Sequence, residues 1–174
     1  MLIYIGADHR GFELKGKLKE FLKLRGYTVV DLGDEKYNES NDYPLFAMKV
    51  AKQVSQEFET ARGILVCGSG VGMSVVANKF LHIRAALAGT PDQAYDSRNE
   101  DDTNVLALGA NYLDEATAKK IVLTWLETPY AGEERFQRRI EEISRLEEKL
   151  ISPITDDEND NGKTGPGPAS KIGW

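Results

Sequence analysis

Residues 63–74, with the sequence GILVCGSGVGMS, place the strongest constraint on the fold of this chain. A short apolar run ends at Cys67, glycines follow at positions 68, 70 and 72, and a helical pattern begins near Ser74. This order predicts a strand, a tight glycine loop and the start of a helix. Glycine lets backbone N–H groups approach a ligand closely, and a helix N-terminus carries partial positive charge. The loop is therefore suited to an anion, either a phosphate or a developing oxyanion.

The spacing of the loop argues against several known ligand-binding motifs. The dinucleotide fingerprint needs a third glycine where Met73 stands, which disfavours a nicotinamide cofactor. The lipase elbow needs glycine two residues before and after its serine, but Ser69 has Cys67 and Val71 there. The P-loop lysine is also missing. Cys67 is then either a small buried residue at the end of a core strand or a reactive thiol.

Thiol-based enzymes of other classes fit less well. A thiol phosphatase needs an arginine where Met73 stands, and a redox pair needs a second cysteine, whereas the chain has one. A single cysteine also cannot form an internal disulfide.

Composition restricts the partners of this chain. The net charge of -6 disfavours nucleic acids and anionic membranes, which attract clustered lysine and arginine. No apolar stretch approaches the roughly 20 residues of a membrane span. We therefore expect a cytoplasmic protein. Residues 1–150 are expected to form one domain, and residues 151–174 a disordered tail with acidic and Gly-Pro segments.

Strand-like and helix-like patterns alternate along residues 1–150. Strands are predicted at residues 2–6, 27–32, 63–67, 84–88 and 104–109, with amphipathic helices between and after them. The first strand, helix and second strand fit into about thirty residues, the length of a parallel crossover unit. The sequence therefore predicts an α/β fold, a three-layer α/β/α sandwich around a five-stranded parallel sheet.

Ligands of open α/β sheets bind at the carboxyl edge, so we expect the site there. Asp8 and His9 follow the first strand and residues 67–72 follow the third. The alternatives are a helix-capping aspartate and an exposed loop histidine. We expect the acidic residues 100–102 at the same edge, as a solvated loop rather than a metal site.

The last predicted helix, residues 132–150, has two faces of interest. Its apolar stripe is suited to packing against another helix, including one of a partner subunit. Arg135 and Arg139 lie four residues apart and so share a face, which allows both to hold one phosphate. The alternative is a solvated face, with the arginines paired to Glu134, Glu141 and Glu142.

A set of short segments carries a family resemblance: GADHRG at residues 6–11, DYP at 42–44, CGSGVGMS at 67–74, ANK at 77–79, IRA at 83–85, TNV at 103–105, and the Arg135-Arg139 pair. Together they resemble the type B ribose-5-phosphate isomerases, a family that includes the galactose-6-phosphate isomerase subunits. The resemblance covers residues 1–150. It implies a Rossmann-like fold and conversion of aldose phosphates to ketose phosphates without metal or cofactor. It also implies homodimers, or tetramers, whose active sites use both subunits.

The resemblance also implies roles by position. Cys67 is the implied base that moves a proton between carbons 1 and 2, and Ser69 holds the enediolate oxygens. The further implied substrate-binding groups are the backbone amides of Gly68, Gly70 and Gly72, the side chains of Asp8 and His9 at the sugar and phosphate, and the phosphate clamp Arg135 and Arg139.

The chain departs from the family pattern at three positions. The family usually has His-Asn where this chain has Glu100 and Asp101, and the histidine opens the sugar ring. An arginine that often follows Gly109 by two residues is Asn111 here. We assign Glu100 as the candidate acid and Asp101 as a candidate substrate-binding residue.

Three hypotheses accommodate the missing histidine. Glu100 keeps a proton beside its acidic neighbours and takes over the acid role. Alternatively, the substrate is another sugar phosphate, such as allose or galactose 6-phosphate, or a tetrose 4-phosphate that cannot close a ring. Or the chain is a non-catalytic sugar-phosphate binder, or a subunit completed by a different partner.

Overall fold

The computed structural model describes residues 1–151. The expected tail at residues 151–174 lies outside the described residues except for Ile151, which is helical. The strands are β1 (Leu2–Ala7), β2 (Thr28–Asp31), β3 (Ala61–Cys67), β4 (Ala85–Leu87) and β5 (Val105–Gly109). The helices are α1 (Phe12–Leu24), α2 (Tyr43–Gln56), α3 (Val71–Ala77), α4 (Pro91–Asn99), α5 (Glu115–Glu127) and α6 (Glu134–Ile151). The alternation predicted from the sequence is confirmed. The strands β2, β4 and β5 are one or two residues shorter than predicted, and β1 and β3 are one or two residues longer.

The strands form one parallel sheet in the order β2-β1-β3-β5-β4. The central strand is β3, which pairs with β1 through Ile64 opposite Ile5 and with β5 through Cys67 opposite Gly109. Residues 63–67 are buried throughout, because helices cover both faces of a parallel sheet. The glycine loop therefore leaves the middle of the carboxyl edge.

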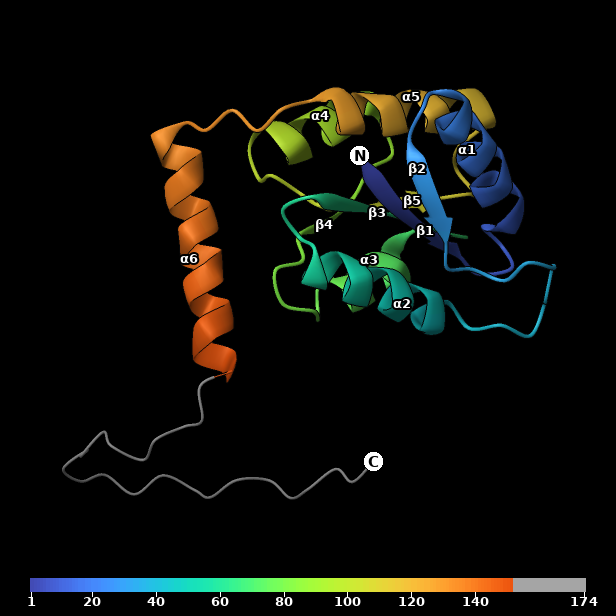
Figure 1. Cartoon of the computed structure of the whole chain (residues 1–174), viewed down its shortest axis with the longest axis horizontal. Helices are drawn as coiled ribbons and strands as arrows, with labels where there is room; N and C mark the ends of the chain where they lie inside the picture. Colours follow the sequence, from blue (N-terminus) through green and yellow to red (C-terminus); the bar gives the residue numbers. More distant parts are fainter. Residues whose placement is uncertain (152–174) are drawn as a thin grey trace, which may run out of the picture.

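Two hydrophobic cores lie on either side of the sheet, as successive strand residues face opposite ways. Ile64 and Val66 point into the core beneath α1 and α5, where Trp125 is buried. Leu65 and Cys67 point into the core beneath α2 and α3. Figure 1 shows α1, α4 and α5 on one side of the sheet and α2 and α3 on the other. This arrangement confirms the three-layer sandwich.

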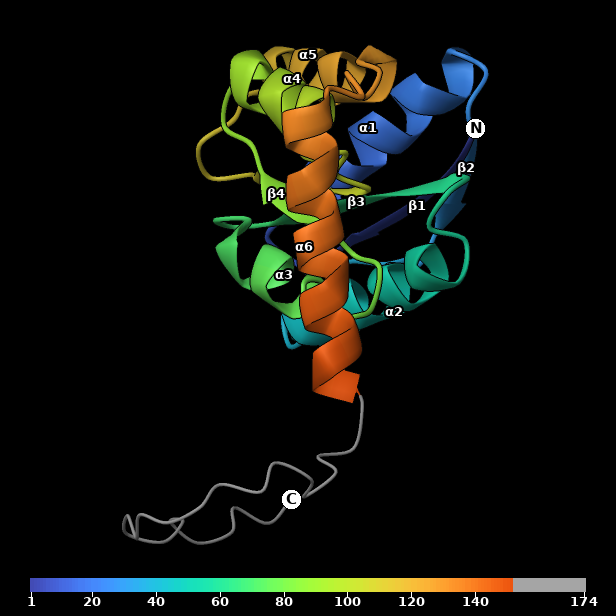
Figure 2. The ribbon, with the colours of Figure 1, turned by 90° about the vertical axis from the view of Figure 1, so that its left-hand side faces the viewer.

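Helix α6 stands apart from these layers. It runs past the β4 side of the domain, from the level of α4 and α5 towards that of α2 (Figure 2). Within α6 only Phe136 is buried, whereas Leu146 and Leu150 are 60% and 87% exposed. Most of its apolar stripe is thus uncovered in the single chain. None of the helices in residues 1–151 has both the length and the apolar character that a membrane crossing requires.

Candidate active site

The loop after β3 depends on one left-handed glycine. Gly70 precedes α3 with φ +78°, and a Cβ there would lie 2.4 Å from Leu87 Cδ1. Only glycine fits such a position without strain. The N–H of Gly70 donates to Cys67 Sγ at 3.1 Å. From the β5 side, the N–H of Ala110 donates to the carbonyl of Cys67 (2.8 Å) and that of Asn111 to the carbonyl of Gly68 (2.9 Å).

A cavity of about 340 Å³ opens beside this loop at the carboxyl edge. It is lined by Asp8, His9, Arg10, Asn41, Asp42, Tyr43, Cys67, Gly68, Ser69 and Gly72. Cys67 is 4% exposed, so it packs in the core and also lines the cavity. The structure thus brings together six residues predicted from the sequence: Asp8, His9, Cys67, Gly68, Ser69 and Gly72.

Asp8 has a structural contact as well as a place in the cavity wall. Its Oδ1 accepts a hydrogen bond from the N–H of Gly11 at 3.0 Å, ahead of α1. Gly11 lies so close to β3 that a Cβ there would be 2.2 Å from the carbonyl oxygen of Val66. The helix-capping alternative for Asp8 is therefore wrong, because Gly11 is the N-cap of α1 and no side chain caps this helix. Asp8 instead fixes the turn that carries His9.

Sequence reasoning missed four residues of the cavity wall: Arg10, Asn41, Asp42 and Tyr43. Tyr43 packs on the glycine loop, because a Cβ on Gly72 would lie 2.6 Å from its ring. The Arg10 side chain lies over Gly68, where a Cβ would be 2.9 Å from Nε. No carboxylate in residues 1–151 forms an ion pair with Arg10. Arg10 and Tyr43 belong to segments that carry the family resemblance, which was the available indication.

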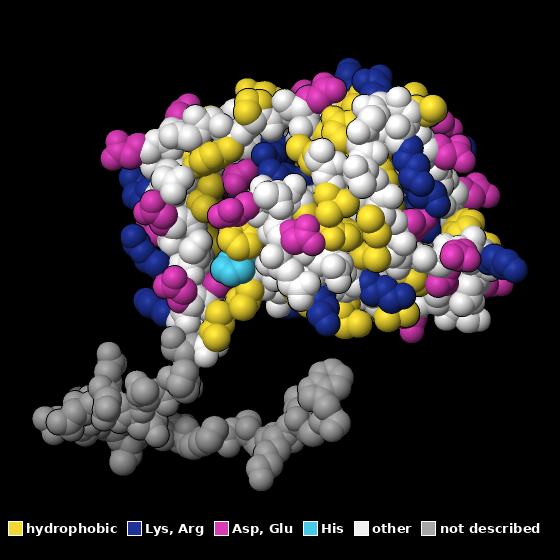
Figure 3. All heavy atoms as spheres, in the orientation of Figure 1, with side chains coloured by type: hydrophobic (Ala, Val, Ile, Leu, Met, Phe, Trp, Pro, Cys, Tyr) yellow, Lys and Arg dark blue, Asp and Glu magenta, His cyan; other side chains and the backbone are white. Residues whose placement is uncertain are grey.

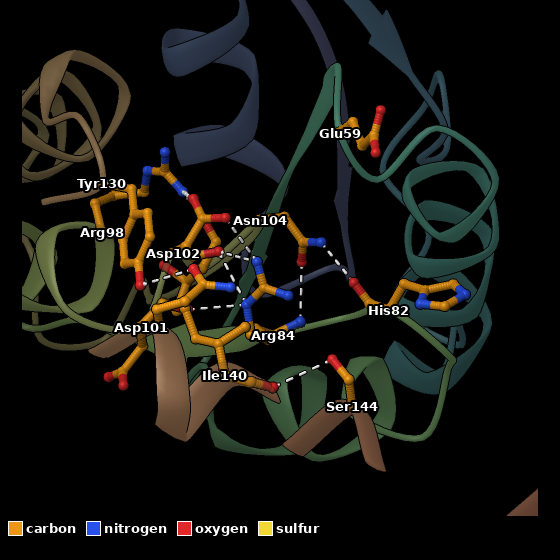
Figure 4. A network of polar contacts seen from close by, with 12 residues as sticks. Glu59, His82, Arg84, Arg98, Asp101, Asp102, Asn104, Tyr130, Ile140 and Ser144 are labelled. Atoms are coloured by element: carbon orange, nitrogen blue, oxygen red, sulfur yellow. Dashed lines mark hydrogen bonds and ion pairs between the residues drawn. The ribbon is translucent and has the colours of Figure 1, made fainter. Parts of the chain in front are cut away.

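The acidic loop lies at the opposite, amino edge of the sheet, so its expected place at the carboxyl edge is wrong. The loop precedes β5, and residues that precede a parallel strand lie at the strand's amino end. There Arg84 donates to the carbonyl of Asp101 (2.8 Å) and to Asp102 Oδ2 (2.8 Å). Arg98 donates to Asp102 Oδ1 at 2.5 Å (Figure 4).

These contacts give the three acidic residues different environments. Asp102 anchors two arginines, so it is not part of a solvated loop. The Asp101 carboxylate is exposed and points away from the network in Figure 4. Glu100 is half-buried at the C-terminal end of α4. Residues 1–151 contain no cluster of three His, Cys, Asp or Glu side chains with metal-binding geometry.

Arg135 and Arg139 lie on α6, and both guanidinium groups stack on Phe136, at 4.3 and 5.9 Å from its ring. Arg135 also forms an exposed ion pair with Glu133 at 2.8 Å. The alternative pairs of these two arginines with Glu134, Glu141 and Glu142 are not formed within residues 1–151, where Glu141 and Glu142 pair with Arg145 and Arg138. The two arginines therefore share a face, as predicted.

Comparison with known proteins supplies the assignment of this architecture. The model of the family described as "Ribose/Galactose Isomerase" matches residues 3–143. The chain belongs to the ribose/galactose isomerase family. This agrees with the resemblance carried by the short segments.

Individual members of the ribose/galactose isomerase family align with this chain along nearly their full length. The ribose-5-phosphate isomerase B of Escherichia coli K12 is 44% identical over 147 residues, which are 84% of this chain and 97% of that protein. The ribose-5-phosphate isomerase B of Mycoplasma genitalium, solved with bound ribulose 5-phosphate, has a TM-score of 0.83 and 38% identity, covering 85% of this chain and 97% of that one. The Clostridium thermocellum enzyme has a TM-score of 0.81 and 43% identity, covering 86% and 99%.

In this member of the ribose/galactose isomerase family, the predicted site residues thus fall into two groups. One group lines the cavity around Cys67, apart from Gly70, which does not line it but donates its N–H to the Cys67 sulfur. The other comprises Glu100 and Asp101 in the acidic loop and Arg135 and Arg139 on α6. The seven-residue strand β3 spans about 20 Å between the sheet edges, so the acidic loop does not meet the cavity of its own chain.

Proposed function

We propose that this chain is an aldose-ketose isomerase that interconverts ribose 5-phosphate and ribulose 5-phosphate. The observation that carries the proposal is the convergence of a thiol, a hydroxyl and a glycine loop on one cavity, through Cys67, Ser69 and residues 68–72. The relatives described above carry the name of this activity, and one was solved with its ketose product.

The reaction needs one base and a group of hydrogen-bond donors. The Cys67 thiolate removes the proton from carbon 2 of the open-chain aldose and returns it to carbon 1 of the enediolate. The hydroxyl proton on oxygen 2 passes to oxygen 1, so atoms and charge balance. The Ser69 hydroxyl and the loop N–H groups donate to the enediolate oxygens, where negative charge develops.

The phosphate requires cations beside the cavity. Arg10 supplies one from the same chain, because its guanidinium lies over Gly68 without a carboxylate partner in residues 1–151. We assign two more to Arg135 and Arg139, whose shared face on α6 allows bidentate contacts.

These two arginines, together with Glu100 and Asp101, reach a Cys67 cavity only from a second copy of the chain. We therefore propose a homodimer with shared active sites. Exposed apolar side chains on two helices support the homodimer. Val71 and Val75 on α3 are 50% and 54% exposed, and the apolar stripe of α6 is also largely exposed. Figure 3 shows hydrophobic side chains gathered along the side of α6 that faces the domain.

Ring opening is assigned to Glu100 of the second copy, acting as a general acid on the ring oxygen. A coupled assay with ribose 5-phosphate, allose 6-phosphate, galactose 6-phosphate and erythrose 4-phosphate tests both substrate and acid. We expect the highest kcat/KM with ribose 5-phosphate. Turnover of erythrose 4-phosphate alone would mean that no ring-opening acid operates, and binding without turnover of any sugar would leave a sugar-phosphate binder.

A further inference from the structure

Asn41 connects the candidate site to the loop behind it. Its Oδ1 accepts a hydrogen bond from the backbone N–H of His9 at 2.8 Å and lies 3.2 Å from His9 Nδ1. Its Nδ2 donates to Asp34 Oδ2 at 2.9 Å. Asn41 and His9 both line the cavity that contains Cys67. One amide group therefore links a cavity residue to a carboxylate outside the cavity.

These contacts determine which way the Asn41 amide faces. A backbone N–H only donates and a carboxylate only accepts, so the amide oxygen faces His9 and the amide nitrogen faces Asp34. Because an amide oxygen only accepts, His9 Nδ1 bonds it only when Nδ1 carries a proton. The geometry thus selects one of the two neutral forms of the imidazole.

We propose that Asn41 is a positioning residue that holds His9 in the Nδ1–H tautomer, leaving Nε2 to accept a hydrogen bond from a sugar hydroxyl. Nε2 has no hydrogen-bond partner in the part of the chain that the structure describes. A proton taken up at Nε2 leaves the bond to Asn41 intact. His9 can then donate to a phosphate oxygen without turning its ring.

A buried lysine supports the loop that carries Asn41. Lys15 is 2% exposed and donates to the carbonyl of Asp34 (3.1 Å) and to Asp31 Oδ1 (2.8 Å). Burial alone would raise the pKa of Asp31, but hydrogen bonds from Lys15 and Lys19 bring it below its ordinary value. Asp31 thus stays charged and holds Lys15 in place, which in turn fixes Asp34 behind Asn41.

An aromatic contact restricts the His9 ring from a second direction. Tyr37 meets the imidazole edge to face, with ring centroids 6.5 Å apart, and meets Phe12 of α1 in the same way at 6.0 Å. Asn41 and Tyr37 come from the loop between β2 and α2. This loop therefore sets both the position and the protonated nitrogen of a residue that follows β1.

Nuclear magnetic resonance of the imidazole nitrogens tests the proposal directly. The chain has two histidines, so a His82→Gln variant identifies the His9 signals. We expect neutral His9 of the wild-type protein to be protonated at Nδ1. In Asn41→Ala we expect protonation to move largely to Nε2, the form that dominates in a free imidazole side chain. Asn38→Ala is the matched control. Asn38 lies in the same loop and accepts a hydrogen bond from the N–H of Ser40, so its replacement should leave the His9 tautomer unchanged.

A double variant separates the hydrogen-bonding role of residue 41 from its effect on the stability of the protein. Asp34→Asn combined with Asn41→Asp exchanges acceptor and donor, keeping the total charge and all the bonds in the chain from Asp34 to His9. We expect it to restore the Nδ1–H form. Nε2–H in the wild-type protein, or Nδ1–H persisting unchanged in Asn41→Ala, would overturn the proposal.

The kinetic consequence rests on the proposed function. Asn41→Ala should lower kcat/KM for ribose 5-phosphate by about tenfold or more, through misplacement of His9, and the double variant should recover most of this loss. An Asn41→Ala enzyme with unchanged kcat/KM would contradict a role for the tautomer in the reaction. A wild-type protein that turns over no sugar phosphate would refute the proposed function, while the nitrogen spectra would still decide the tautomer.

Discussion

The two edges of the sheet use their polar side chains in opposite ways. At the carboxyl edge, Arg10 and His9 Nε2 have no carboxylate or hydrogen-bond partner in residues 1–151, and they border a cavity. At the amino edge, Arg84 and Arg98 each bond one oxygen of Asp102. Polar groups that satisfy one another stabilise a fold, whereas unpaired groups beside a cavity are typical of ligand sites. Substitutions at the two edges should therefore affect different quantities.

Replacement of the thiol should have the largest effect. Cys67→Ser should lower kcat for ribose 5-phosphate by about 10³-fold, because a neutral hydroxyl is a poor base at this position. Substrate affinity and melting temperature should change little, since the two side chains have similar shapes. The coupled assay and titration calorimetry measure these quantities. Ser74→Ala, a change in α3 outside the cavity wall, is the control. Full activity in Cys67→Ser would remove the proposed base.

Mixed dimers test whether the two groups of site residues come from different chains, with Arg135 and Arg139 of one chain completing the Cys67 cavity of the other. Cys67→Ser should be nearly inactive alone, and Arg135→Gln/Arg139→Gln should be nearly inactive at ribose 5-phosphate concentrations far below its raised KM, at which all the samples are compared. After co-refolding, half of the dimers are mixed and each holds one intact site, so activity should recover to about a quarter of the wild-type value. Each variant refolded alone is the control. No recovery, in mixtures shown to contain mixed dimers, would place each complete site within one chain.

Substitutions at the amino edge should lower the stability of the fold. Asp102→Asn should lower the free energy of unfolding by about 3 kcal/mol, because it leaves Arg84 and Arg98 without their counter-charge. Asparagine tolerates the positive φ of 45° at this position, so the backbone adds no strain. Asp101→Asn is the matched control in the same loop and should stay within about 0.5 kcal/mol of the wild-type protein. Urea titration separates the two, and equal effects would contradict the assigned roles.

The smallest expected effect is that of Arg10, a cavity-wall residue with no ion-pair partner in residues 1–151. Arg10→Gln should raise KM for ribose 5-phosphate about fivefold, with little change in kcat, because it removes a phosphate contact made equally in the ground and transition states. Arg25→Gln, at an exposed arginine that stacks on Phe21, controls for the loss of one positive charge. Inorganic phosphate as a competitive inhibitor gives a second measure. Equal KM values for the two variants would argue that Arg10 is only a surface residue.

The fold could be predicted from the sequence because each local pattern agrees with the global arrangement. Apolar runs of five or six residues, separated by amphipathic helices, require a parallel sheet covered on both sides. The cavity around Cys67 was predictable for the same reason, since Asp8, His9 and residues 67–72 directly follow strands. Glu100 and Asp101 were misplaced because they precede a strand.

The remaining part of the site depends on packing that periodicity does not encode. Asn41 lies in an irregular loop whose path is set by Lys15 and Asp34, a contact between residues 19 positions apart. Arg10 stands next to His9 in the sequence, but only the close approach of its side chain to Gly68 places it in the cavity wall. Long-range contacts of polar side chains therefore could not be predicted from the sequence.

The bonds from Ala110 and Asn111 to the loop after β3 have a consequence for biosynthesis. The glycine loop is translated about forty residues before the segment that fixes its shape, so a nascent chain emerging from the ribosome carries Cys67 without a formed pocket around it. The Cys67 sulfur is thus least protected against oxidants and alkylating agents during translation, in the interval before β5 is added to the sheet.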